Sequence, residues 1–361
     1  MPSDANFAVR VRALCWALLA LLGFGAQADE LLFSSTASGT MQLHVLNEAS
    51  KSARPLTAGP GDNDNAVWST DGRRIAFVST RDGRPQVYLM HADGTGQRRI
   101  SADSDFSQSP AWSPDSRSLA YTSHRGGKHG LYTQDLGTGQ ERLVLTAVGG
   151  VSGLAWSPAG NKLAFATSTG VRKGNVLIAD LHSGTTVPLP LDEGASNFRP
   201  AWSPSGDSLA FVSSAGRKGI NIYTCSAAGG NVKALTQTIY TSATPTWSPD
   251  GKYIAFTSNL ETGDRGDIFV AEMATGQLRN LTRHDHEDLE PAWAADSRSI
   301  YFVSFRSGTS QLYRVALDGT TEGVSLAARY ESTPLPRPGA SASLAAAATA
   351  DNLAHKPSRR E

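Results

Sequence analysis

The chain has 361 residues, of which 40% are apolar, and its 33 basic residues equal its 33 acidic residues in number. This balanced charge gives no electrostatic reason to bind nucleic acid or an anionic membrane, so neither is expected as the main partner. Its 35 glycines suit a globular protein with many turns.

The first 28 residues have the order of parts found in a secretory signal peptide. A basic region with Arg10 and Arg12 precedes an apolar stretch over 13–24, and Ala26-Gln27-Ala28 offers a cleavage site. The stretch is short for a membrane span, so we expect export to the periplasm and no transmembrane segment after cleavage. An N-terminal membrane anchor is the alternative. Cleavage leaves Cys225 as the single cysteine, expected to be a buried, unreactive thiol in a strand.

The rest of the chain is dominated by a repeat that opens on tryptophan, usually as Trp-Ser-Pro-Asp-Gly. Successive copies lie 44 to 46 residues apart and begin at Trp68, Trp112, Trp156, Trp202, Trp247 and Trp293. A short apolar strand follows each tryptophan by seven residues, as in Ile75-Ala76-Phe77-Val78, and two further strands complete the unit. Four short strands in each unit, without helical periodicity, predict an all-β fold, a β-propeller of four-stranded blades.

The residues of the motif explain the turn that it forms. Proline presets φ at the second turn position, aspartate bonds to its own backbone at the third, and glycine accepts a positive φ. The tryptophan before the turn is large and flat, so it can fill the gap between neighbouring sheets.

The number of blades depends on the two ends of the repeat region. Residues 31–57 resemble a unit without its first strand, because Leu31-Leu32-Phe33-Ser34 matches the strand at Ile75–Val78. The segment 333–339 has the spacing of a tryptophan strand, so we expect it to complete that unit and close a seven-bladed ring with both chain ends. A six-bladed ring with a surplus half-unit is the alternative. The predicted propeller covers 29–339, and the Ala- and Ser-rich tail 340–361 is expected to be disordered.

The pattern Pro-Ala-Trp-Ser-Pro-Asp-Gly-x-x-Ile-Ala-Phe resembles the blades of the TolB-like β-propeller repeat family. The resemblance covers about residues 31–339 and is shared with the propellers of dipeptidyl- and prolyl-peptidases. It implies a periplasmic binding scaffold in the cell envelope. TolB itself carries an additional N-terminal α/β domain for which the expected mature chain has no room, so roles of that domain are not transferred.

No catalytic apparatus is expected. A hydrolase domain needs a Gly-x-Ser-x-Gly elbow, and Gly149-Gly150-Val151-Ser152-Gly153 has the wrong spacing. No cofactor is expected, and the protein is expected to be a monomer that is not an enzyme.

One charged loop is a candidate metal site. Imidazole and carboxylate groups can bind a divalent ion, and this loop holds His284, His286, Asp288 and Glu290. His124 and His129 are expected on the same face. Some propeller polysaccharide lyases that resemble this blade type hold a metal with several histidines, which makes a metal-dependent glycan-degrading enzyme the alternative function. The other interpretation is a solvated charged loop. The loop 62–65 is likewise either a Ca²⁺ site or a set of aspartate- and asparagine-stabilised turns.

A partner would bind at the channel mouth. The residues three places before each tryptophan are expected to line that mouth, and the basic loops between second and third strands to surround it. This candidate face comprises Asn65, Ser109, Arg172, Lys173, Arg199, Arg217, Lys218, Thr244 and Glu290. Its expected partner is an envelope protein or an acidic glycan, recruited by complementary charge. The alternative is an ordinary charged surface.

Overall fold

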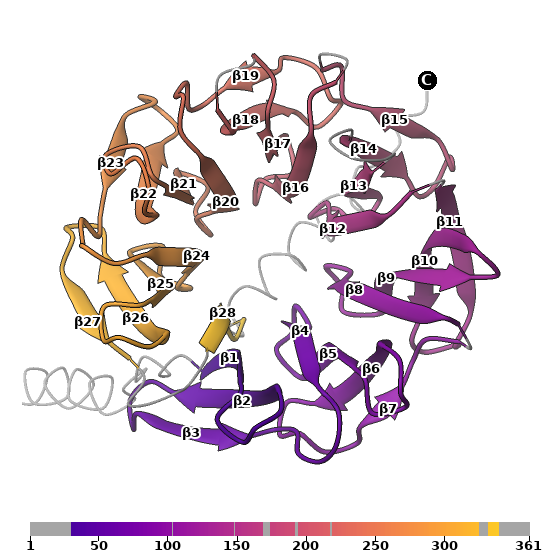
Figure 1. Cartoon of the computed structure of the whole chain (residues 1–361). Helices are drawn as coiled ribbons and strands as arrows, with labels where there is room; N and C mark the ends of the chain where they lie inside the picture. Colours follow the sequence, from indigo (N-terminus) through magenta and orange to yellow (C-terminus); the bar gives the residue numbers. More distant parts are fainter. Residues whose placement is uncertain are drawn as a thin grey trace, which may run out of the picture.

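Seven four-stranded sheets form a ring around a central channel (Figure 1). This computed structural model describes residues 30–338 except 103, 148, 169–173, 192–193, 217–218 and 325–330. The described residues form strands and turns, and they include no helix that is long and apolar enough to cross a membrane. The seven-bladed all-β propeller is confirmed, and the six-bladed alternative is wrong. The expected signal peptide and disordered tail lie outside the described residues.

The blades are numbered here in chain order, and each is given from its innermost to its outermost strand. Blade 1 consists of β28 (Glu331–Pro336), β1 (Glu30–Ser35), β2 (Gln42–Asn47) and β3 (Ser52–Pro55). Blade 2 consists of β4 (Asn63–Trp68), β5 (Arg74–Ser79), β6 (Gln86–His91) and β7 (Arg98–Arg99). Blade 3 consists of β8 (Phe106–Trp112), β9 (Ser118–Arg125), β10 (Lys128–Asp135) and β11 (Glu141–Ala147). Blade 4 consists of β12 (Val151–Trp156), β13 (Lys162–Ser168), β14 (Gly174–Asp180) and β15 (Thr186–Pro188).

The remaining three blades follow the same order. Blade 5 consists of β16 (Asn197–Trp202), β17 (Ser208–Ser213), β18 (Asn221–Ser226) and β19 (Lys233–Ala234). Blade 6 consists of β20 (Ser242–Trp247), β21 (Tyr253–Ser258), β22 (Asp267–Glu272) and β23 (Leu278–Asn280). Blade 7 consists of β24 (Asp288–Trp293), β25 (Ser299–Ser304), β26 (Gln311–Ala316) and β27 (Thr321–Gly323).

Blade 1 is built from both ends of the described chain. Strand β28 pairs antiparallel with β1, and Leu335 lies opposite Leu32. In blade 2, Val67 of the innermost strand lies opposite Ala76 of the second strand. Leu335 therefore has the place in blade 1 that Val67 has in blade 2. The prediction that 333–339 supplies the missing strand is therefore confirmed. Its prolines are compatible with an innermost strand, because that strand has a ladder partner on one side only.

The tryptophans join each of blades 2 to 7 to the blade before it. The indole Nε1–H of each tryptophan donates to a backbone carbonyl in the innermost strand of the preceding blade. That carbonyl belongs to the residue one place before the tryptophan position of the preceding blade, and the distances are 3.0 to 3.1 Å. The six donor–acceptor pairs are Trp68–Leu335, Trp112–Val67, Trp156–Ala111, Trp202–Ala155, Trp247–Ala201 and Trp293–Thr246. Because Trp68 reaches Leu335, the same contact joins blade 2 to the closing strand of blade 1.

Each tryptophan strand leads into a turn fixed by the serine that follows. Ser69 Oγ accepts the backbone N–H of Arg74 at 2.9 Å, and Gly72 has a φ of 66°. The same serine-to-backbone hydrogen bond recurs in blades 3 to 6, at Ser113, Ser157, Ser203 and Ser248. In blade 7 Ala294 stands at this place, so this turn lacks the hydroxyl.

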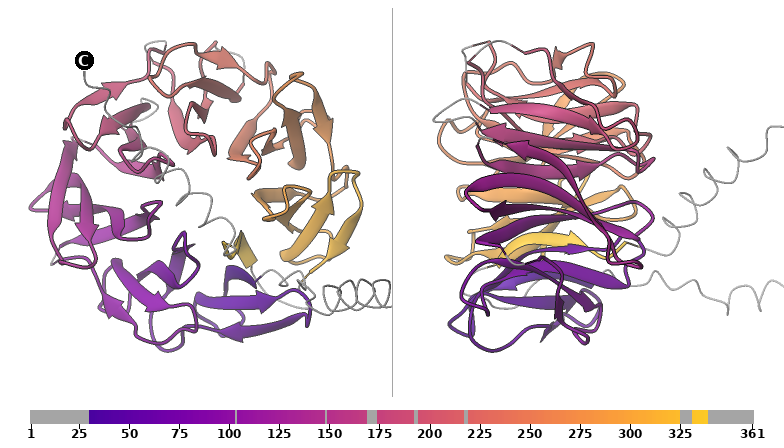
Figure 2. Two further views of the ribbon diagram at one scale, coloured as in Figure 1. Left: turned by 180° about the vertical axis from the view of Figure 1, so that it is seen from behind. Right: turned by 90° about the vertical axis from the view of Figure 1, so that its right-hand side faces the viewer.

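The antiparallel order of strands gives the ring two different ends. Turns between first and second strands and between third and fourth strands lie at one end, which we call the lower rim. Loops between second and third strands, and those that connect consecutive blades, lie at the other end, the upper rim. The side view shows the strands of all blades running between these two rims (Figure 2).

Candidate functional site

The innermost strands share a backbone irregularity at one height of the channel. In each of blades 2 to 7 the pairing register between first and second strands shifts, three residues before the tryptophan. The residue at the shift has a left-handed φ between 49° and 62° in every case. We call these six residues the bulge ring: Asn65, Ser109, Gly153, Arg199, Thr244 and Glu290.

A left-handed backbone costs about 1–2 kcal/mol at a residue other than glycine. Five of the six ring residues are not glycine and lack that residue's conformational freedom. Bulges commonly re-aim a side chain beside a binding or active site, and such strain concentrates at functional positions. These six positions were expected to line one channel mouth, and the repeated bulge is the feature that sequence reasoning missed.

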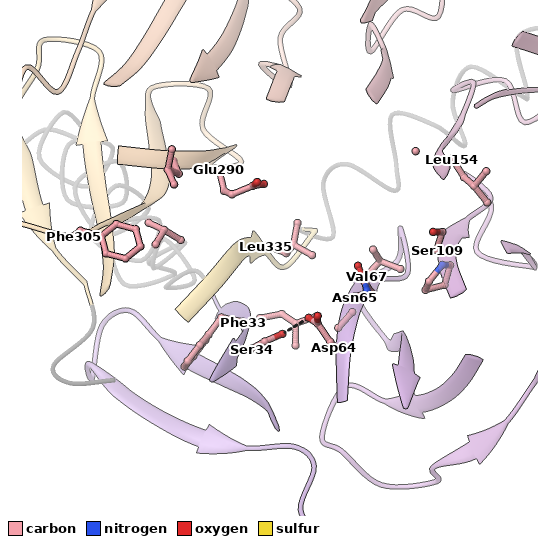
Figure 3. Close-up of a pocket in the computed structure, with 16 residues that line it drawn as sticks. Phe33, Ser34, Asp64, Asn65, Val67, Ser109, Leu154, Glu290, Phe305 and Leu335 are labelled. Atoms are coloured by element: carbon pink, nitrogen blue, oxygen red, sulfur yellow. Dashed lines mark hydrogen bonds between the residues drawn. The ribbon is translucent and has the colours of Figure 1, made fainter. Parts of the chain in front are cut away.

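Several ring residues border a cavity of about 560 Å³ in the channel (Figure 3). Its walls come from blades 1, 2, 3, 4 and 7. The ring contributes Asn65, Ser109, Gly153 and Glu290, whereas Arg199 and Thr244 do not line the cavity. Most of the other lining residues are apolar and include Phe33, Val67, Leu154, Leu289, Phe305 and Leu335. The cavity thus combines apolar walls with a few polar groups, as small-ligand and peptide sites do.

The charged groups that line this cavity are acidic. Asp64 accepts a hydrogen bond from Ser34 Oγ at 2.9 Å, which leaves the carboxylate able to accept another donor (Figure 3). Glu290 Oε1 lies 3.5 Å from Arg199 Nη1, an ion pair that joins blade 7 to blade 5 past the intervening blade 6. Both partners are partly exposed, at 35% and 51% of their side-chain surface, so solvent weakens the pair and a ligand can compete for either group.

The four candidate metal ligands have separate partners. The ring of His284 lies 5.4 Å from that of His286, and His284 Nδ1 accepts the backbone N–H of His286 at 3.2 Å. Asp288 Oδ2 accepts from Arg306 at 2.8 Å, and Glu290 faces Arg199. Among the residues that the structure describes, no three histidine, cysteine or acidic side chains come together in a group suited to a metal ion. In the described structure these four residues therefore do not form one ligand set, and the metal interpretation of the loop stays a prediction.

Asp288 is the most buried member of that set. Its side chain is fully buried, and burial raises its pKa although Arg306 and neighbouring hydroxyl groups oppose the shift. One carboxylate oxygen, Oδ1, has no hydrogen-bond partner among the described residues. Asp288 is the first residue of β24, just as Asn63 is the first residue of β4. Asn63 likewise bonds to an arginine of its own blade, Arg81. Asp288 thus braces the upper-rim loop of blade 7.

The loop at 62–65 uses both of its carboxylates within the protein. Asp62 Oδ1 accepts the backbone N–H of Met41 at 3.0 Å, and Asp64 accepts Ser34. These contacts join blades 1 and 2 at the upper rim. The calcium interpretation of this loop stays a prediction.

Three of the basic residues expected to surround the channel mouth fold back onto their own blades. Arg81, Arg125 and Arg306 each donate Nε–H to the serine two residues earlier, at 2.8 to 3.0 Å. Each guanidinium also lies over a tyrosine ring of the next strand, at 4.0 to 4.7 Å. The spacing Ser-x-Arg at the end of the second strand is a signal that could have identified this arrangement. Four members of the candidate face, Arg172, Lys173, Arg217 and Lys218, lie outside the described residues.

The buried-thiol prediction for Cys225 is confirmed. The residue is 3% exposed, and burial raises the pKa of its thiol to about 11.

A family model described as the TolB beta propeller domain matches residues 23–108, 92–262 and 240–352. The chain belongs to the TolB beta propeller domain family. No curated protein sequence matches this TolB-type propeller.

Solved structures similar to this TolB-type propeller include TolB proteins, lyases and peptidases. TolB from Acinetobacter baumannii is 20% identical, with a TM-score of 0.55, and the match covers 83% of this chain and 79% of TolB. An oligogalacturonate lyase in complex with manganese is 18% identical, with a TM-score of 0.61, covering 82% of this chain and 84% of the lyase. A puromycin-hydrolyzing peptidase of Mycobacterium tuberculosis is 16% identical, with a TM-score of 0.66, covering 83% of this chain but 54% of the peptidase. At these identities the likeness shows the shared fold alone.

Proposed function

We propose that this protein is an exported, non-catalytic binding propeller whose channel mouth at the bulge ring recognises a segment of another envelope protein. The observation that carries the proposal is the bulge ring itself. Six blades present the same left-handed backbone toward the channel but six different residues. A repeated backbone with varied side chains is what a recognition surface on a rigid scaffold requires.

The chemistry of the cavity favours a protein segment over an acidic glycan. Its charged lining residues, Asp64 and Glu290, would repel an acidic sugar polymer, while apolar walls such as Phe305 and Leu335 suit an aliphatic or aromatic side chain. A segment with a basic residue next to an apolar one satisfies both features. Arg81, Arg125 and Arg306, which could otherwise face an acidic glycan, are instead held by their own blades.

Export to the periplasm is part of the proposal. It is supported by the basic, apolar and small-residue order of residues 1–28 and by the match to the TolB propeller family. Growth of cells that express the full chain, followed by fractionation and N-terminal sequencing, tests it. The expected result is a periplasmic protein that starts at Asp29.

The binding proposal is tested by capture from periplasmic extract with the mature chain. The ring variant Asn65→Gly/Glu290→Gly removes two side chains at positions where glycine suits the left-handed backbone. A matched control, Asn231→Gly/Glu322→Gln, makes the same kind of backbone change at a lower-rim turn and removes an exposed carboxylate elsewhere. We expect one partner to be held by the wild type and the control and to be lost from the ring variant. Equal capture by all three proteins would contradict the proposal.

A further inference from the structure

A cluster of aromatic and imidazole rings lies on blade 3, apart from the channel cavity. Strand register places His124 of β9 directly opposite His129 of β10 and also opposite Phe106 of β8. The two imidazole rings are 4.6 Å apart between centroids with their planes 58° apart, and Phe106 stacks on His124 at 5.1 Å and 4°.

The hairpin that carries the two histidines is short. Gly126 and Gly127 both have positive φ angles, 56° and 78°, which matches the two-residue turn that best fits the twist of antiparallel strands. Side chains alternate between the faces of a strand, so Arg125 and Lys128 point to the face opposite the histidines. Arg125 is held there by Glu141 at 2.6 Å. Both cationic neighbours are thereby directed away from the imidazoles.

A carboxylate fixes the proton of one ring. His124 Nδ1 lies 2.9 Å from Asp105 Oδ2, whose other oxygen faces Arg84 at 3.4 Å. An ionised carboxylate only accepts hydrogen bonds, so Nδ1 carries a proton, and in the neutral ring Nε2 is then the nitrogen with the lone pair. A histidine that ligates a metal characteristically donates its other nitrogen to a carboxylate in this way.

The separation of the two rings allows both to reach one metal ion. With a metal–nitrogen bond of about 2.0 Å, a ligated ring has its centroid about 3.2 Å from the metal. Two imidazoles in adjacent positions about 90° apart then have centroids about 4.5 Å apart, against about 5.2 Å at a tetrahedral angle. The observed 4.6 Å follows from the direct pairing of the two strands, and it is compatible with the 90° arrangement that Cu²⁺ and Ni²⁺ favour with nitrogen and oxygen ligands.

We propose that His124 and His129 form a surface site for a divalent transition-metal ion of the copper type, with water completing its coordination and Asp105 orienting His124. The site lies at the upper-rim end of blade 3 and uses none of the residues of the bulge ring. It therefore stands or fails separately from the proposed function.

The test is a titration of the untagged mature chain with Cu²⁺, followed by pulsed electron paramagnetic resonance, which detects the imidazole nitrogens coupled to the copper. We expect one bound ion with two coupled imidazoles. His129→Gln should leave a single imidazole, and His124→Gln/His129→Gln should abolish the site. Asp105→Asn should keep both imidazoles but weaken binding about 10–100-fold, because it removes the group that fixes the His124 tautomer.

The chain offers a matched control in its other neighbouring pair of histidines. His284 and His286 are 5.4 Å apart, and His284 Nδ1 is occupied by a backbone N–H. The variant His284→Gln/His286→Gln should therefore retain the two-imidazole spectrum. The proposal is overturned if the wild type shows no such spectrum, if the spectrum survives in His124→Gln/His129→Gln, or if it is lost in the control.

Discussion

Replacing Trp68 with phenylalanine should weaken the closure of the ring more than the same change at another blade. Trp68 is 7% exposed and packs among Leu32, Ile75 and Leu335, and its indole N–H donates to the Leu335 carbonyl at 3.0 Å. Loss of that donor costs about 1–3 kcal/mol, and the smaller ring forfeits about 1 kcal/mol of apolar contact. The expected loss in free energy of unfolding is therefore about 2–4 kcal/mol.

The matched comparison is Trp156→Phe, which removes an equivalent hydrogen bond to Ala111. Ala111 lies inside the continuous hairpin of β8 and β9, whereas β28 reaches blade 1 from the far end of the chain. Both variants should lower the urea midpoint, but Trp68→Phe alone should accelerate amide hydrogen exchange in 331–336. An unchanged midpoint, or equal exchange of β28 in the two variants, would refute the idea that Trp68 holds the closing strand.

Three further predictions concern single side chains. Ala294→Ser should raise the free energy of unfolding, measured by urea denaturation, by about 0.5–1.5 kcal/mol. The added hydroxyl can accept the Ser299 N–H, as the equivalent serine does in five other blades. A loss of stability would count against this prediction. Burial disfavours the charged form of Glu141, but hydrogen bonds from Arg125 and Tyr121 outweigh it and lower the pKa below the ordinary 4.5. The contribution of ionised Glu141 to the free energy of unfolding is therefore present above that pH and lost as the pH falls through the folded-state pKa. The difference in free energy of unfolding between wild type and Glu141→Gln should thus shrink toward about pH 2. A difference that does not depend on pH would contradict this. Native Cys225 should resist iodoacetamide at pH 8 until urea unfolds the chain, because burial raises its pKa to about 11; mass spectrometry that finds rapid labelling of the native protein would contradict this.

The fold was predictable because the repeat encodes it locally. Each unit carries its own turn chemistry, its apolar second strand and a tryptophan, and these features need no knowledge of distant residues. Even the closing strand at 333–339 could be placed, because Leu31-Leu32-Phe33-Ser34 lacks a first strand of its own. The indole-to-carbonyl hydrogen bonds explain why tryptophan in particular occupies the boundary between blades.

The site was only partly predictable, because its features arise from tertiary structure. The spacing placed Asn65, Ser109 and Glu290 correctly around the channel. Their left-handed φ angles depend on a bulge that pairing with the second strand creates, and asparagine, serine and glutamate give no shared local signal for it. Sequence position alone also gave no sign that Arg81 and its equivalents in blades 3 and 7 fold onto aromatic rings of their own blades.

The most direct test of the channel-mouth proposal is photo-crosslinking in cells that export the protein. A photoreactive residue at Leu154, which lines the cavity, should form an adduct with the partner, and one at Thr138, in an exposed lower-rim turn, should not. Adding Asn65→Gly/Glu290→Gly should abolish the adduct at 154. An adduct from position 138 without one from position 154 would show that the partner binds the other end of the ring.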